Sequence, residues 1–418
     1  MRPESTDVNV IHVARHFGNL EFRRVERLEA TLSYRGSSTF TWDSDTYTFN
    51  LDSQLPGLQI PIRLYSFEAE LTEGNDYSIL LTEENGWLSE FIIEAPAAEL
   101  SETEAEVLIA HTGDSVGPVD VYLEPPGTVL AAATPRGTLS FLESLPVTSI
   151  TPGEFEVNLT QVGNPASVAM SSDVFEIAAG VRTTLTIIDG LTPASPAAAL
   201  ASGDGIDTPL ADRHLRAGVR ALNAMTSGDA LDIAVDGNFS PPLIPGVPFA
   251  VPSEYAQVVA GRYTLMVTPA GNSGVIEVEQ SILALPGQRG TVFVRGEPGS
   301  LTAEYSYDSQ RRIRDQAALS IYFGATVVSG VDVFIVEPDT DLNTVAPTAT
   351  LTDTDPVSRL LAGLQGYTVT VREAGTQNVL AGPVAAAIGL EGNYGILITN
   401  SASGSGVDIT LFDGFSGG

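Results

Sequence analysis

The segment Gly113-Asp114-Ser115-Val116-Gly117 fits the pattern G-x-S-x-G, which can place a nucleophilic serine on a sharp turn between a strand and a helix. That chemistry needs the helix, because the turn and the helix together help to stabilise an oxyanion. Here Pro118 follows, and residues 119–123 alternate as in a strand. We therefore interpret 113–117 as a loop between strands. Since no catalytic triad, carboxylate pair or cofactor loop stands in a supporting context, we predict that the protein is not an enzyme.

The histidines are a second group that could do chemistry. His12 and His16 would lie about 13 Å apart on a continuous strand, too far to share one metal ion with bonds near 2 Å, although a turn after the strand would bring them closer. His12 and His111 occupy equivalent positions in a repeated pattern, where Asn223 and Phe323 replace them. This replacement favours a packing or hydrogen-bonding role at the end of a strand.

A calcium site is the third candidate. Asp339, Asp341 and Asn343 alternate as oxygen ligands do at the start of a calcium-binding loop. The loop departs from that pattern, because Thr344 stands where a glycine is expected and Thr350 where a bidentate glutamate is expected. A solvated acidic loop is favoured, and no cofactor is expected other than calcium.

Composition excludes several classes of protein. With 52 acidic and 20 basic residues, the 418-residue chain has a formal charge of −32, which repels phosphate backbones, so nucleic acid is not an expected partner. Apolar residues make up 43% of the chain, but they form alternating runs rather than one run of about 20, so membrane insertion is not expected. The absence of cysteine removes disulfides and thiolate chemistry.

A fourfold repeat organises the chain. An apolar strand, a second strand, a strand that opens on an aromatic residue and a closing strand recur in that order. The aromatic residues Tyr47, Phe155, Tyr263 and Tyr367 are 108, 108 and 104 residues apart. A period near 100 residues is too long for a solenoid repeat and suits a β-sandwich. We therefore predict an all-β protein of four tandem immunoglobulin-like antiparallel β-sandwich domains, at residues 1–100, 101–205, 206–308 and 309–418, each with its own core.

The repeat also predicts where side chains point. The first strand of the first repeat, residues 8–14, alternates and is expected to be half-buried. In the second strands Asp120, Asp232 and Asp332 alternate with apolar residues, and we expect them to face water. Between repeats, residues 193–205 have the composition of a linker, although they could equally hold an edge strand. In the segment 308–316, Arg311, Arg312 and Arg314 could pair with an acidic patch on a neighbouring repeat, but a solvated connection is favoured.

Residues 107–123 read VLIAHTGDSVGPVDVYL and resemble the opening of the bacterial DUF4397 domain, whose pattern is roughly V-R-V-V-H-A-S-P-D-A-P-x-V-D-V-Y-V. Residues 153–157 and 178–184 look like the aromatic strand and closing turn of that family. The resemblance is closest in the second repeat and weakest in the first, where residues 20–23 replace the Val-Asp-Val-Tyr strand. It implies an immunoglobulin-like sandwich in exported, often surface-attached bacterial proteins. The family is one of unknown function, so the resemblance brings no catalytic residues.

The first hypothesis about function is a non-enzymatic extracytoplasmic structural protein, either a surface stalk or the repeating subunit of an extracellular filament or matrix. A sandwich has open edge strands, so a terminal segment of one molecule could complete a sheet in the next. The partner would then be the protein itself. The candidate assembly residues are Val8 and Val10 near the start of the chain, and Val407, Ile409, Leu411 and Phe412 near its end.

The alternative is an adhesive surface module that binds a glycan or another ligand. In the first repeat Trp42, Trp87, Tyr65 and Tyr77 could form a sugar-stacking face, although such aromatic residues pack into cores more often. For either hypothesis the expected location is the bacterial periplasm, cell surface or exterior. Residues 1–7 contain no apolar signal segment, so either a secretion signal has been removed from this sequence or the protein is cytosolic, and removal is favoured.

Overall fold

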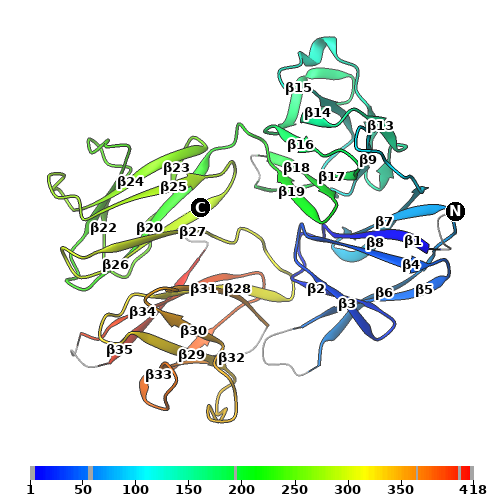
Figure 1. Ribbon diagram of the computed structural model, residues 1–418. Coiled ribbons are helices and arrows are strands. Elements are labelled where there is room, and N and C mark those ends of the chain that lie inside the picture. Colours follow the sequence, from blue (N-terminus) through cyan, green and yellow to red (C-terminus); the bar gives the residue numbers. More distant parts are fainter. Residues whose placement is uncertain (1–4, 55–59, 193–194, 364–365, 403–405, 415–418) are drawn as a thin grey trace. The chain divides into compact units, whose positions relative to one another are not determined.

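The computed structural model describes residues 5–54, 60–192, 195–363, 366–402 and 406–414 (Figure 1). Regular secondary structure in these ranges consists of β-strands and one short 3-10 helix, η1 (Leu130–Ala132). The all-β prediction is therefore confirmed. The chain divides into two units, Met1–Leu215 and Arg216–Gly418, which are described separately.

The first unit begins with two four-stranded sheets, in the orders β4-β1-β7-β8 and β3-β2-β5-β6. Val10 and Ile79 of one sheet and Phe22 and Phe49 of the other are fully buried in one apolar core between them. We call this arrangement sheet pair 1. Its strands are β1 (Ser5–His12), β2 (Leu20–Arg24), β3 (Arg27–Leu32), β4 (Ser37–Asp43), β5 (Thr46–Ser53), β6 (Ile62–Glu70), β7 (Asn75–Glu84) and β8 (Trp87–Pro96).

Sheet pair 2 completes the first unit. One sheet has the order β12-β9-β17-β18-β19, with β13 also on β9, and the other has the order β11-β10-β14-β15, with β16 on β14. Ile109 and Leu185 meet Val121 and Leu159 in the core. The strands are β9 (Ala105–His111), β10 (Val119–Glu124), β11 (Gly137–Leu139), β12 (Glu143–Ser144), β13 (Thr148–Ile150), β14 (Gly153–Gln161), β15 (Asn164–Ser171), β16 (Phe175–Ile177), β17 (Arg182–Thr192), β18 (Ser195–Gly203) and β19 (Ile206–Leu210).

The second unit contains sheet pairs 3 and 4. Sheet pair 3 combines β23-β20-β26-β27 with β22-β21-β24-β25, and sheet pair 4 combines β31-β28-β34-β35 with β30-β29-β32-β33. Each encloses its own apolar core. The strands of pair 3 are β20 (Ala217–Met225), β21 (Leu231–Val235), β22 (Ile244–Val247), β23 (Ala256–Val258), β24 (Gly261–Pro269), β25 (Val278–Ala284), β26 (Arg289–Gly296) and β27 (Thr302–Tyr307). Those of pair 4 are β28 (Gln316–Phe323), β29 (Gly330–Val336), β30 (Ala349–Thr352), β31 (Val357–Gly363), β32 (Gly366–Glu373), β33 (Val379–Ala387), β34 (Asn393–Asn400) and β35 (Val407–Asp413).

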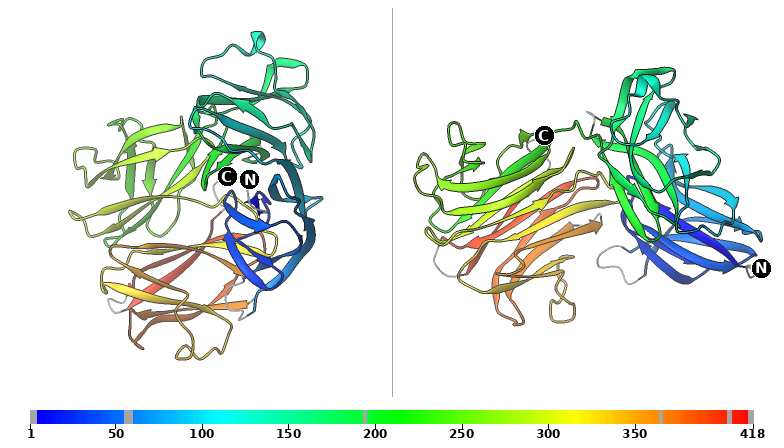
Figure 2. Two further views of the ribbon diagram at one scale, coloured as in Figure 1. Left: turned by 45° about the vertical axis from the view of Figure 1, so that its right-hand side comes forward. Right: turned by 45° about the horizontal axis from the view of Figure 1, so that its top comes forward.

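The same strand order occurs in all four sheet pairs. Counted from the start of each pair, one sheet runs fourth-first-seventh-eighth and the other third-second-fifth-sixth. Pair 2 elaborates this plan, because its fourth strand is split into β12 and β13, its sixth into β15 and β16, and β19 is added. Figure 2 shows the sheets of each unit as stacked layers.

The sheets are not purely antiparallel. In each pair the first strand runs parallel to the seventh: β1 with β7, β9 with β17, β20 with β26 and β28 with β34. Parallel neighbours need a long connection, and here the intervening strands, most of them in the opposite sheet, provide it. The expectation of antiparallel sandwiches was wrong in this respect.

Within each unit the two sheet pairs share a further buried apolar contact, which we call the joint. The first joint contains Ile11, Val13, Leu80, Ile93, Leu108, Ala110, Ile188, Ala198 and Leu200. The second joint contains Leu222, Ala224, Phe293, Tyr322 and Leu397. These residues lie on the outer faces of the fourth-first-seventh-eighth sheets, so the first strands are covered on both sides, and β20 and β28 are buried along their whole length. The prediction of a half-buried first strand was wrong, because the partner sheet pair covers its second face.

Two connecting segments also differ from a flexible linker. Most of the segment 193–205 forms β18, so the segment holds a strand and not a linker, among the residues described; positions 193 and 194 lie outside them. It is not the edge strand offered as the alternative, because β18 pairs with β17 on one side and β19 on the other. In the segment 308–316, Asp308 and Ile313 are buried. That segment is therefore not the solvated connection that the sequence suggested.

Candidate functional site

The equivalent residues His12, His111 and Asn223 close the loop that follows each first strand. His12 Nε2 donates to the carbonyl of Gly18 at 2.8 Å, and His111 Nε2 donates to that of Gly117 at 3.3 Å. Asn223 Nδ2 donates to the carbonyl six residues later in the same way, at 2.8 Å. Burial lowers the pKa of His111, so the ring is neutral in the fold. The structure thus assigns these side chains to loop closure.

Ser115 of the G-x-S-x-G segment lies in a loop and not at the start of a helix. Its main-chain N–H donates to Asp189 Oδ1 at 2.9 Å, and its hydroxyl donates to the same oxygen. After Pro118 the chain enters β10. The serine is therefore held by a carboxylate, and the nearby His111 is held by the main chain.

The second-strand aspartates do not simply face water. Asp120 is 5% exposed and Asp332 is 9% exposed, and Asp232 is half-buried. In sheet pair 2, Thr138 Oγ1 donates to Asp120 Oδ1 at 2.5 Å, and the N–H of Gly163 donates to Asp120 Oδ2 at 2.7 Å. The prediction that these carboxylates point into solvent was wrong, because two neighbouring segments fold over that face.

The same contact, which we call the aspartate brace, recurs in the second unit. Asp232 accepts from the N–H groups of Gly246 and Gly271, and Asp332 accepts from Thr350 Oγ1 and the N–H of Gly375. In all three braces one carboxylate oxygen binds a hairpin-turn glycine with positive φ: 71° at Gly163, 75° at Gly271 and 70° at Gly375. Each brace therefore ties the second strand to the turn between the fifth and sixth strands.

The predicted calcium ligands form a loop that is closed by its own contacts. Asp341 Oδ1 accepts from the main-chain N–H and the side-chain amide of Asn343, each at 3.0 Å. Arg372 Nη1 donates to Asn343 Oδ1 at 3.2 Å, and Asp339 adopts a positive φ of 67°. The guanidinium of Arg372 thus lies beside Asn343 Oδ1, where a calcium ion bound by that oxygen would have to lie.

The aromatic residues of sheet pair 1 are mostly internal. Trp42 is 8% exposed and Tyr77 is 5% exposed, whereas Trp87 is 71% exposed. The Tyr65 hydroxyl donates to Glu90 Oε2 at 2.6 Å, and this hydrogen bond raises the pKa of Tyr65 to about 12. These four residues do not share one exposed face, because Trp42 and Tyr77 belong to the core.

The assembly candidates lie in two kinds of strand. Val8 and Val10 are fully buried on β1, which sits between β4 and β7. β35, at the edge of its sheet, pairs with β34 on one side. Within β35, Val407 belongs to the core of sheet pair 4, and Ile409 packs against the same core. Leu411 is 39% exposed, and Phe412 packs on the second joint. Both segments are therefore part of their own sheets and not spare strands.

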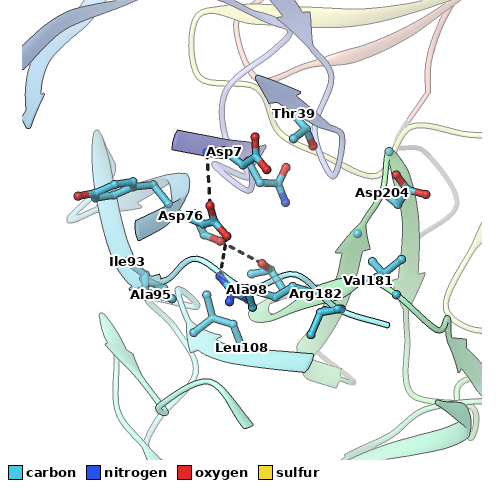
Figure 3. Close-up of a pocket in the computed structure, with 18 of the residues that line it drawn as sticks. Asp7, Thr39, Asp76, Ile93, Ala95, Ala98, Leu108, Val181, Arg182 and Asp204 are labelled. Carbon is cyan, nitrogen blue, oxygen red and sulfur yellow. Dashed lines mark hydrogen bonds and ion pairs between the residues drawn. The ribbon is translucent and has the colours of Figure 1, made fainter. Parts of the chain in front are cut away.

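A pocket of about 680 Å³ lies beside the first joint, between sheet pairs 1 and 2. Figure 3 shows its lining residues Asp7, Asp76, Arg182 and Asp204. Asp76 Oδ1 accepts from the N–H of Asp7 at 3.4 Å, and Asp76 Oδ2 lies 3.3 Å from Arg182 Nη1. Arg182 Nη2 lies 2.7 Å from Glu106 Oε2. The lining combines carboxylates and hydroxyls with apolar side chains such as Ile93 and Leu108, and its arginine is engaged by two carboxylates.

A more deeply buried network lies at the second joint. The side chains of Arg220 and Asp308 are each 2% exposed, and Nε lies 3.5 Å from Oδ2. Thr291 Oγ1 donates to Asp308 Oδ2 at 2.6 Å and accepts from Arg220 Nε at 2.9 Å. Tyr255 donates to the same oxygen at 2.7 Å, and burial raises the pKa of Tyr255, so it remains a donor. Arg220 Nη1 also donates to the carbonyl of Gly414 at 3.1 Å.

Sequence reasoning did not find Arg182, Arg220 or Asp308. A signal existed for Arg220, because β20 reads AGVRALNAM and a charge in such an apolar strand needs a buried partner. The partner lies after the last strand of the same sheet pair, and no local pattern identifies it. Arg182 is the first residue of β17, next to a turn, and its sequence neighbourhood carries no comparable signal.

Among the residues that the structure describes, no group of three or more His, Cys, Asp and Glu side chains could hold a metal ion. The described part of the chain also contains no helix that is long and apolar enough to cross a membrane. Comparison with protein-family models and with curated proteins found no match.

Proposed function

We propose that this chain is a non-enzymatic structural protein of the bacterial periplasm, cell surface or exterior. In this proposal it consists of four immunoglobulin-like sandwiches of the DUF4397 type and serves as a stalk or as the repeating subunit of a filament or matrix. The observation that carries the proposal is the joint, because a buried apolar contact couples two sheet pairs within each unit. Coupled β-sandwiches resist bending and extension better than freely linked ones.

The chemistry of the polar side chains supports the same function. Ser115, His12, His111 and Asp120 have the residue types of catalytic groups, yet each is bound to a loop or turn of its own sheet pair. The acidic excess supports exposure outside the cell, since a charge of −32 keeps an array of β-sheets soluble. Loop contacts and, for Asp120, the aspartate brace give these groups a structural role.

Single-molecule stretching of the full chain tests the coupling. A unit of about 200 residues that unfolds in one step releases about 70 nm, whereas one sheet pair of about 100 residues releases about 35 nm. We expect steps near the larger value, and Leu80→Asp in the first joint should split one of them into two smaller steps. Four equal small steps in the unaltered chain would contradict the coupling.

Location and assembly need their own test. In cells that make the protein, we expect external protease to remove it and immunogold labelling to place it outside the cytoplasmic membrane. A filament would grow most simply by addition along the open edge of β35, whose Leu411 is partly exposed. Leu411→Arg should then abolish the filaments seen by electron microscopy. Independently, finding the protein in the cytoplasm would contradict the proposed location and end the proposal.

The first-unit pocket favours a second candidate, a module that binds a glycan or another ligand. Its carboxylates Asp7, Asp76 and Asp204 suit a ligand with hydroxyl or amine donors, its apolar side chains suit a carbon skeleton, and its size falls in the range of small-molecule sites. A glycan array probed with the full chain separates the two functions. Thermal unfolding with and without calcium tests the acidic loop at Asp341, since a ligand specific for the native state raises the melting temperature.

A further inference from the structure

The strand register relates the two sheet pairs of the first unit residue by residue. His12 and His111 make the same loop contact, so residue 8 of β1 corresponds to residue 107 of β9. The parallel partner of Val8 is Tyr77, and that of Val107 is Thr183. One residue earlier on the seventh strands, Asp76 therefore corresponds to Arg182. One residue later, Ser78 corresponds to Thr184.

These equivalent residues meet each other at the first joint. Asp76 Oδ2 lies 3.3 Å from Arg182 Nη1, and the buried hydroxyls of Ser78 and Thr184 lie 3.1 Å apart. Contact between a residue and its own equivalent is the property of a twofold interface. The joint is thus built like a symmetric dimer interface, although its two halves belong to one chain.

A symmetric face carries a risk of pairing with the wrong partner. Two copies of sheet pair 1, from two chains, would bring Asp76 against Asp76, and two copies of sheet pair 2 would bring Arg182 against Arg182. Only pair 1 against pair 2 gives opposite charges at this position. Both side chains are only 16–17% exposed, so solvent screens their interaction weakly and like charges would oppose pairing strongly.

The second joint uses different residues for the same discrimination. By the registers of β26 and β34, Thr291 of sheet pair 3 corresponds to Gly395 of sheet pair 4. Arg220 fills one half of the joint, whereas in the other half the ring of Phe412 lies directly over Gly395. Since Asp308 of the same sheet pair balances Arg220, the two halves differ in polarity and shape rather than in net charge, and neither resembles a half of the first joint.

We propose that Asp76 and Arg182, together with Arg220 and Gly395, are specificity determinants that dictate which sheet pair packs on which. Their partner surface is another face of the same chain, and they prevent the joints from forming between like faces of neighbouring molecules. The inference deepens the proposed structural function and rests on it, because a crowded array of exchangeable joints would crosslink at random.

An engineered disulfide reports the pairing in the full chain. The chain has no cysteine, so Ser78→Cys with Thr184→Cys supplies the only thiols, at side chains that already lie 3.1 Å apart. Under mild oxidation we expect a disulfide within one chain, seen as a monomer on a non-reducing gel and in size-exclusion chromatography. A disulfide between chains reports exchanged or like-face pairing.

Charge variants in this reporter background test the determinants. Asp76→Arg or Arg182→Asp should slow intrachain disulfide formation about tenfold and raise the share of linked dimers. The double swap should restore a rate within about twofold of the reference. The swap has a basis in the register, because Asp7 precedes Val8 on β1 as Glu106 precedes Val107 on β9, so an acidic residue occupies the equivalent position beside each site. Arg27→Asp, at a side chain 74% exposed, is the matched control and should change nothing.

Restoration by the swap supports the inference, since lost packing alone would not be reversed by exchanging charges. The inference is overturned if either single variant links within the chain as fast as the reference, or if the swap is no faster than the singles. Circular dichroism of each variant identifies a failure to fold, and in that case the swap alone decides. A cytoplasmic location would refute the proposed function without altering these rates, so the two failures are distinguishable.

Discussion

The aspartate brace of sheet pair 2 makes a quantitative prediction. Asp120→Ala removes a carboxylate that accepts from Thr138 Oγ1 and from the N–H of Gly163. It thereby removes the side-chain link from β10 to β11, whose main-chain pairing remains, and the link from β10 to the turn between β14 and β15. The apolar core on the opposite face of β10 is untouched, so the change isolates the brace from core packing.

The expected loss of stability follows from the two hydrogen bonds. A hydrogen bond to a charged group contributes about 1.5–3 kcal/mol, so the two together would contribute about 3–6 kcal/mol. Both donors lie on exposed residues, and water replaces part of each bond, so we expect a loss of about 2–3 kcal/mol. In a unit of about 200 residues this lowers the melting temperature by about 4–12 °C. Asp120→Asn, which keeps one acceptor oxygen, should lose about half as much.

Urea unfolding of the full chain, with hydrogen exchange to resolve the first unit, measures the effect. Asp114→Ala is the matched control, because Asp114 is an exposed aspartate in the same sheet pair. A cycle that combines Asp120→Ala with Thr138→Ala should show coupling, since the two substitutions remove the same hydrogen bond. If Asp120→Ala is no worse than the control, or if the cycle is additive, the brace does not stabilise the fold.

Three further substitutions test other contacts. Burial lowers the pKa of His111. The neutral ring therefore contributes its full stability above about pH 6.5, and this stability is lost as the pH falls toward the folded pKa. His111→Asn, which imitates the third repeat, should make the melting temperature of the first unit less dependent on pH between about pH 7.5 and 5. Arg220→Leu leaves the buried Asp308 with the more distant Arg359, 3.7 Å from Oδ1, as its remaining arginine. It should cost about 3 kcal/mol in urea unfolding, the low end for breaking a buried ion pair, and much of this should be recovered when Asp308→Leu is added. Gly395→Ala places a methyl group against the ring of Phe412, and the resulting overpacking should cost about 1–3 kcal/mol, with Phe412→Leu restoring part of the melting temperature.

The strands were predictable because their signals are local. The second strands and the strands that open on Tyr47 or its equivalents alternate with period two and end at turn glycines, and they are strands in the structure. The environment of Asp120 was not predictable in the same way. Alternation shows which face of a strand a residue occupies, but the turn glycine that covers Asp120 lies 43 residues later in the chain. The role of His12 and His111 was half predicted, since the replacement by asparagine indicated hydrogen bonding but not its acceptor.

The joints explain the largest error of sequence reasoning and set a rule for the repeat. Alternation in β1 predicted one buried face, yet β20 is apolar on both faces, as strands covered on both sides are. The second face of each first strand becomes buried only when another sheet pair covers it, so a lone sheet pair would expose Ile11 and Leu80 or their equivalents to water. The chain closes these faces two at a time, so an added or deleted single repeat leaves one face open. A change of two repeats that form a joint of their own leaves none.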